Sequence, residues 1–160
     1  CEYPNENVFS TSFEWHNNNH YVYYISDYDS LYILDGNEKR IELIGNVDFD
    51  LPENYVDLLH ADWISGTDQM LLYIACETGT LLKIINISTG ASVQELYIDG
   101  DVTIEDIYGS CSLLLVKENG GISIHQWNML TGENVILVNN LTACQFAKFD
   151  VKNQLIYFIQ

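Results

Sequence analysis

Two short motifs in this sequence could undergo chemistry at an asparagine side chain. Asn86-Ile-Ser88 and Asn140-Leu-Thr142 both have the Asn-X-Ser/Thr pattern that accepts an N-linked glycan in secreted proteins. Each motif follows an apolar, strand-like run and precedes a turn or a new strand, so each asparagine is expected to be exposed. We therefore predict that at least one of Asn86 and Asn140 carries a glycan if the chain is secreted.

The four cysteines could form disulfides or remain thiols. None of Cys1, Cys76, Cys111 and Cys144 has the spacing of a zinc ligand pair. An even number of cysteines permits two disulfides, whose pairing the spacing does not decide. However, the last three lie in apolar segments, where a thiol can be buried as a small hydrophobic side chain. Both interpretations remain open.

Two acidic stretches could bind calcium. One is the run 99–106, and the other contains Asp48, Asp50 and Glu53. Neither has the alternate oxygen ligands, central glycine and final glutamate of an EF-hand loop. We therefore expect exposed loops there, and no metal site.

The histidines are expected to be structural. His16 and His20 flank three asparagines in a turn-like, solvated stretch. His60 and His125 lie in strand-like runs, where hydrogen-bonded histidines are common. The chain also contains no GxSxG, no phosphate-binding glycine loop and no protease-like cysteine motif. We therefore predict that this segment has no catalytic residues, no cofactor and no enzyme activity, although a lectin or enzyme on this architecture is a third alternative.

The composition limits the class of partner. The chain has 160 residues, with 23 acidic and 6 basic side chains and a net charge of −17. Such a chain repels phosphate backbones, so nucleic acid is not expected as a partner. No apolar run approaches the roughly 18 residues of a membrane-spanning helix. The expected partners are a protein ligand or neighbouring domains, and no direct membrane insertion is expected.

The elements that would position these residues repeat along the chain. Four apolar strand cores are centred on Val22, Leu71, Leu113 and Leu155, at separations of 42 to 49 residues. This period is typical of propeller blades of about four strands each. We therefore predict an all-β fold with about four four-stranded antiparallel blades in one propeller segment, residues 1–160. The expected blade ranges are 12–50, 58–100, 102–138 and a truncated 144–160.

The aligned repeats resemble a known family. An acid and an aromatic residue, a polar turn and an aromatic strand recur in EWHNNNHYVYYIS, DWISGTDQMLLYIA and FDVKNQLIYFI. This pattern is similar to the YWTD repeats of the low-density-lipoprotein receptor class B, in degenerate form. Ile25-Ser26 and Ile74-Ala75 replace the threonine and aspartate of the motif. The positions that match as structural repeat residues are Trp15, Tyr23, Tyr24, Asp62, Trp63, Tyr73, Asp150 and Tyr157.

The resemblance implies a location and a function. Members of this family usually close six blades, so these repeats would be part of a larger ring. The degenerate repeats also resemble those of sevenless/ROS-type receptor tyrosine kinases, which would place a kinase domain elsewhere in the full chain. Because the chain opens on Cys1 and ends at Gln160 within an apolar run, we expect it to be a segment of a longer protein.

Two functions follow from this architecture. The first is an extracellular, cell-surface receptor ectodomain that binds a ligand or organises neighbouring domains. There Trp127 is a candidate contact residue, whereas Trp15 and Trp63 are expected in the blade cores. The alternative is an intracellular WD40-like propeller scaffold in a multiprotein complex, located in the cytoplasm.

Overall fold

The computed structural model describes two parts of the chain in different detail. It gives the backbone of strands at 14–15, 21–25, 31–35 and 40–43, and it describes residues 51–160 apart from Ser65, Ser88, Asn119 and the side chain of Leu59. Within these ranges all regular secondary structure is β-strand. The prediction of an all-β, antiparallel architecture is confirmed. Over the same ranges, no helical segment has the length and hydrophobicity that a membrane-spanning helix requires.

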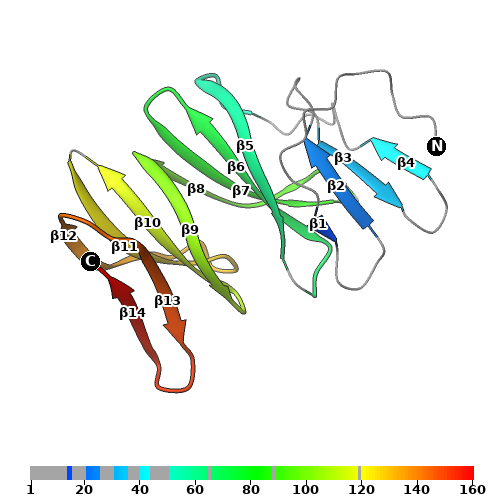
Figure 1. Ribbon diagram of the computed structural model, residues 1–160. Coiled ribbons are helices and arrows are strands. Elements are labelled where there is room, and N and C mark those ends of the chain that lie inside the picture. The colour runs from blue at the N-terminus through cyan, green and yellow to red at the C-terminus, as the bar shows by residue number, and fades with distance from the viewer. Residues whose placement is uncertain are drawn as a thin grey trace. The chain divides into compact units, whose positions relative to one another are not determined.

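The strands form four successive antiparallel sheets (Figure 1), and within each sheet the strands follow one another in chain order. The first sheet contains β1 (Glu14–Trp15), β2 (Tyr21–Ile25), β3 (Leu31–Asp35) and β4 (Arg40–Leu43). The second contains β5 (Tyr55–Trp63), β6 (Gln69–Cys76), β7 (Gly79–Asn86) and β8 (Ser92–Asp99). The third contains β9 (Asp101–Tyr108), β10 (Cys111–Glu118), β11 (Gly121–Asn128) and β12 (Asn134–Leu141). The fourth contains β13 (Phe146–Asp150) and β14 (Leu155–Ile159).

The chain divides into two compact units. One comprises Cys1–Cys76 and Leu82–Val93, and the other comprises Glu77–Leu81 and Gln94–Gln160. The first unit holds the first sheet together with β5 and β6. The second holds the third and fourth sheets, and β7 and β8 contribute residues to both units.

Burial explains which strands are central and which lie at an edge. The inner strands β6, β7 and β10 each have five or six consecutive buried residues, because both of their faces are covered. The outer strands β8 and β12 are mostly exposed. The continuous apolar runs of β6, β7 and β10 therefore become sheet interiors, whereas those of β12 and β14 remain largely exposed.

One pairing recurs from sheet to sheet. Asp62 pairs with Leu71 in the second sheet, Asp106 with Leu113 in the third and Asp150 with Leu155 in the fourth. In the first sheet the residue opposite Val22 is Trp15. The four apolar residues aligned in the sequence thus all lie on the second strand of a sheet, and three of them lie opposite an aspartate.

Within the second unit, the fourth sheet packs on the third. A core cluster of Leu113, Leu115, Ile124, Leu141 and Ala147 is covered by half-buried residues that include Ile156 and Phe158. Two carboxylates of β9 also accept hydrogen bonds from the backbone of β13. Glu105 accepts from the N–H of Ala147 at 3.4 Å, and Asp106 accepts from the N–H of Phe149 at 2.9 Å.

Candidate functional site

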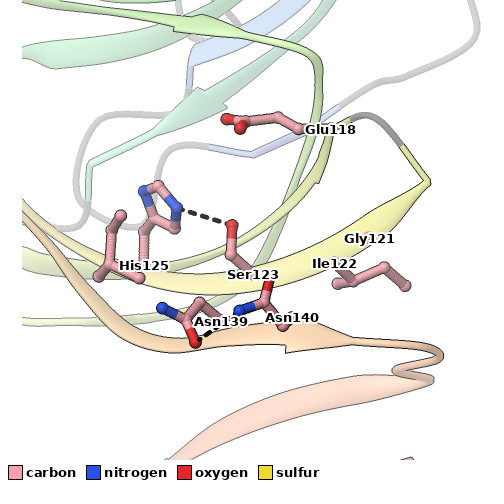
Figure 2. Close-up of a pocket in the computed structure, with 8 residues that line it drawn as sticks. Glu118, Gly121, Ile122, Ser123, His125, Asn139 and Asn140 are labelled. Carbon is pink, nitrogen blue, oxygen red and sulfur yellow. Dashed lines mark hydrogen bonds between the residues drawn. The ribbon is translucent and has the colours of Figure 1, made fainter.

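A pocket of about 150 Å³ opens on the third sheet (Figure 2). It lies where the β10–β11 hairpin meets the outer strand β12. It combines aliphatic, amide, hydroxyl, imidazole and carboxylate groups. The lining residues are Glu118, Gly121, Ile122, Ser123, His125, Ile136, Asn139 and Asn140.

The pocket arises from irregular pairing between β11 and β12. Ile122 pairs with Leu141 and Ile124 pairs with Val138, so an interval of three residues on β12 lies opposite an interval of two residues on β11. A second shift follows between Ile124 and His125. Such extra residues bend a strand and redirect its side chains. Asn140 lies in this distorted stretch with a φ of 57°, a left-handed conformation that asparagine tolerates better than most residues.

His125 forms the wall of the pocket. Its side chain is buried, its Nε2 lies 2.8 Å from Ser123 Oγ, and its Nδ1 lies 3.2 Å from Asn134 Nδ2. Burial lowers the pKa of His125, against the smaller opposing effects of the Asn134 hydrogen bond and the Glu118 charge. The ring is therefore neutral at pH 7 and fully hydrogen-bonded. The prediction that His125 lies in a strand and is hydrogen-bonded is confirmed.

Ser123 and His125 form a hydrogen-bonded pair at the pocket. They are two apart on β11, so they lie on one face and resemble a nucleophile and its base. Both ring nitrogens of His125 are hydrogen-bonded, Nε2 with Ser123 Oγ and Nδ1 with the Asn134 amide. These bonds hold the Ser123 hydroxyl in place at the pocket.

The two sequon asparagines lie in different environments. Asn86 is half-buried at the end of β7, and its Oδ1 accepts hydrogen bonds from Thr89 N at 3.1 Å and Thr89 Oγ1 at 3.2 Å. Asn140 is exposed near the end of β12 and lines the pocket, where its Nδ2 lies 3.3 Å from Asn139 Oδ1 (Figure 2). Asn140 is thus the more accessible of the two.

The repeat positions are distributed over the sheets. Asp62 Oδ1 lies 3.0 Å from His60 Nε2, and the half-buried Trp63 ends β5. Tyr73 is buried and meets the ring of His60 edge-on at 6.0 Å. Asp150 accepts hydrogen bonds from Asn153, and the exposed Tyr157 meets Phe146 edge-on. Trp15, Tyr23 and Tyr24 lie on β1 and β2, where only the backbone is described.

The cysteines of the described region are thiols. Cys76 is buried and Cys111 and Cys144 are half-buried, with no disulfide among the three. Burial raises the pKa of Cys144, and the nearby Glu105 charge acts in the same direction. Cys1 lies outside the described residues. A disulfide that joins any two of the other three is therefore not formed in this structure.

The expectation of an exposed loop over the acidic run 99–106 is wrong, because Asp99 ends β8 and Asp101–Tyr108 form β9. Glu105 and Asp106 are hydrogen-bonded to β13, whereas Asp99 and Asp101 are exposed. No group of three potential metal ligands occurs in the described part of the chain. The other acidic stretch, at Asp48 and Asp50, lies outside that part, as do His16 and His20.

One expectation about contact residues is wrong. Trp127 is completely buried in β11, so it has no surface for a partner to contact. Its indole nitrogen has no hydrogen-bond partner among the described residues.

Sequence reasoning missed most of the pocket. Ser123, Asn139, Glu118 and Gly121 belong to no recognisable motif. The one available signal was the alternation of Ser123 and His125 on a strand. Asn140 alone was predicted as a site residue.

Comparison with known proteins adds no relative. No protein-family model matches the chain, and no curated protein matches it significantly.

Proposed function

We propose that this chain is a β-propeller segment of a cell-surface receptor ectodomain, where it binds a protein ligand or organises neighbouring domains. The observation that carries the proposal is the recurring pairing of an aspartate with the aligned leucine in three successive sheets. Repeated sheets of one design that follow each other along the chain are the signature of a propeller.

The packing in the second unit supports the propeller. Asp106 bridges its own sheet to the first strand of the next, while Leu113 and Leu115 are buried beneath that sheet. A blade repeated with this contact forms a ring when enough copies follow. The family resemblance sets the expected number at six.

One feature favours the extracellular location, and a second indicates the kind of ligand. Asn140 is exposed in a complete sequon, as an acceptor of an N-linked glycan must be. The net charge of −17 favours a protein ligand with a basic surface, whose association would weaken as salt increases.

One observation favours the alternative, a WD40-like scaffold in the cytoplasm. Cys76, Cys111 and Cys144 are thiols, and thiols are typical of a reducing compartment. The two locations therefore predict different covalent states of the same chain.

The test is the intact mass of the mature full-length protein from its native cells, with and without glycosidase and after thiol alkylation in denaturant. A mass loss on glycosidase treatment would support the ectodomain. Unmodified Asn86 and Asn140 together with four alkylated cysteines would contradict the ectodomain and support the scaffold.

A further inference from the structure

We propose that the pocket on the third sheet binds an N-acetylhexosamine ring, the first sugar of a glycan attached to Asn140. This inference rests on the proposed extracellular function. It adds a ligand class and a structural role to a site that is otherwise only a sequence motif.

The acceptor atom is already at the pocket. Asn140 lines it, and its Nδ2 is the atom that carries an N-linked sugar. That nitrogen lies beside Asn139 Oδ1, also at the pocket, so a ring attached there begins at the pocket wall (Figure 2). Asn86, in the other sequon, does not line this pocket.

The pocket is small and open. It measures about 150 Å³ and opens to solvent, so a sugar attached at Asn140 would lie against its wall and a second sugar would extend into solvent.

The chemistry of the lining fits an acetylated amino sugar. Ile136 is an exposed apolar side chain that also lines the pocket, at 56% exposure, and suits the acetyl methyl group and the apolar face of the ring. Ser123, Glu118 and Asn139 supply a hydroxyl, a carboxylate and an amide for the sugar hydroxyls and the acetamido group. His125 holds Ser123 in place through the 2.8 Å hydrogen bond.

Attachment of the sugar to Asn140 is a group transfer. Asn140 Nδ2 attacks the anomeric carbon of a polyprenyl-diphosphate-linked oligosaccharide supplied by the secretory pathway. The new C–N bond replaces the C–O bond to phosphate, the diphosphate leaves, and one amide proton is released. The pocket plays no part in this step and receives the ring as the chain folds.

The experiment compares one sugar with none. The full chain is secreted from a eukaryotic host and trimmed with an endoglycosidase that leaves a single N-acetylglucosamine on the asparagine. Its melting temperature is compared with that of Thr142→Ala, which removes the sequon and keeps Asn140. We expect the sugar at Asn140 to raise the melting temperature by about 2–4 °C. In Ile136→Ser and in Ser123→Ala the rise should largely disappear, because the contacts with the ring are lost.

A direct readout accompanies the thermal one. Nuclear Overhauser contacts are expected between the acetyl methyl group of the sugar and the methyl groups of Ile136. A single sugar at Asn86, compared with Ser88→Ala, is the matched control, and its effect should not change in Ile136→Ser.

The outcomes separate the two proposals. A sugar present at Asn140 that gives neither the thermal shift nor the methyl contacts would overturn the proposal that the pocket holds this sugar, and so would a sugar at Asn86 alone. Neither result would contradict the proposed ectodomain function. Sugars at neither asparagine would overturn both. Saturable binding of free N-acetylglucosamine to the unglycosylated chain, lost in Ile136→Ser, would show that the pocket binds a saccharide of another molecule. It would overturn the proposal that the pocket holds the glycan attached to Asn140.

Discussion

The carboxylate of Asp106 accepts a hydrogen bond from the backbone N–H of Phe149 at 2.9 Å, and this bond joins the third sheet to the fourth. It places a charged acceptor on a half-buried backbone donor. The neighbouring Glu105 repeats the arrangement at 3.4 Å with Ala147. Acidic residues on β9 therefore hold the next sheet through its backbone.

Removing the Asp106 carboxylate should loosen this contact. We expect Asp106→Ala to lower the free energy of unfolding by about 1.5–2 kcal/mol, because hydrogen bonds to charged groups are stronger than neutral ones and the Phe149 N–H loses its partner. Urea denaturation followed by circular dichroism measures the change. Asp99→Ala, at an exposed position of β8, is the matched control and should cost less than about 0.5 kcal/mol. Equal losses in the two variants would show that the carboxylate does not join the sheets.

A glycine between the second and third sheets should not tolerate a side chain. Gly100 has a φ of 125°, and a Cβ there would overlap the carbonyl oxygen of Lys117. We expect Gly100→Ala to destabilise the fold by about 2–3 kcal/mol, from backbone strain and the clash together. Gly121→Ala is the control, since its Cβ would lie 3.8 Å from the nearest atom, the Glu118 carbonyl oxygen. It should be neutral or slightly stabilising. A Gly100→Ala protein that melts at the wild-type temperature would contradict the placement of this turn.

The sheets were predictable because their signal is local and repeated. Leu71, Leu113 and Leu155 were aligned from apolar runs and turn residues alone, and each lies opposite an aspartate on the preceding strand. Strand interiors covered on both faces must be apolar, so their positions can be read directly from the residues. The turns that join Asp62 to Leu71, Asp106 to Leu113 and Asp150 to Leu155 differ in length, so the pairing itself comes from the structure.

The pocket was not predictable for the opposite reason. Its shape depends on extra residues in β12 around Val138, and no pattern in the sequence marks a bulge there. Trp127 shows the same limit, because its burial depends on which face of β11 is covered. The thiol state of Cys111 and Cys144 likewise depends on distances between strands, which spacing along the chain does not contain.

The stability of the fold should depend on pH through His125. Burial lowers the pKa of this ring below its ordinary value of 6.5, so the folded state favours the neutral form and the unfolded chain takes up the proton first. The contribution of His125 to the free energy of unfolding is then complete above about pH 6.5 and is lost as the pH falls through that value toward the folded-state pKa. Urea denaturation between pH 7.5 and 5.5 should show a decline for the wild type and a shallower decline for His125→Gln. Equal declines in the two proteins would show that His125 does not contribute to the pH dependence.

The exposed edge at β12 should promote association of the unglycosylated chain. Val135, Ile136 and Leu137 are all exposed on this outer strand, whose far side pairs with no other strand in the described residues. Such an edge can add a strand from another molecule, and a charge on it blocks the addition. We expect Val135→Lys to reduce aggregation several-fold on mild heating, measured by light scattering, with an unchanged melting temperature.

The control separates edge pairing from simple hydrophobic exposure. Leu130 is exposed to 74%, more than Val135 at 43%, but it lies in the turn between β11 and β12. If strand addition drives association, Leu130→Lys should leave the aggregation rate close to that of the wild type, because a turn offers no row of backbone donors and acceptors. Equal reductions by the two lysines would show instead that exposed apolar area alone controls association, and the edge of β12 would have no special role.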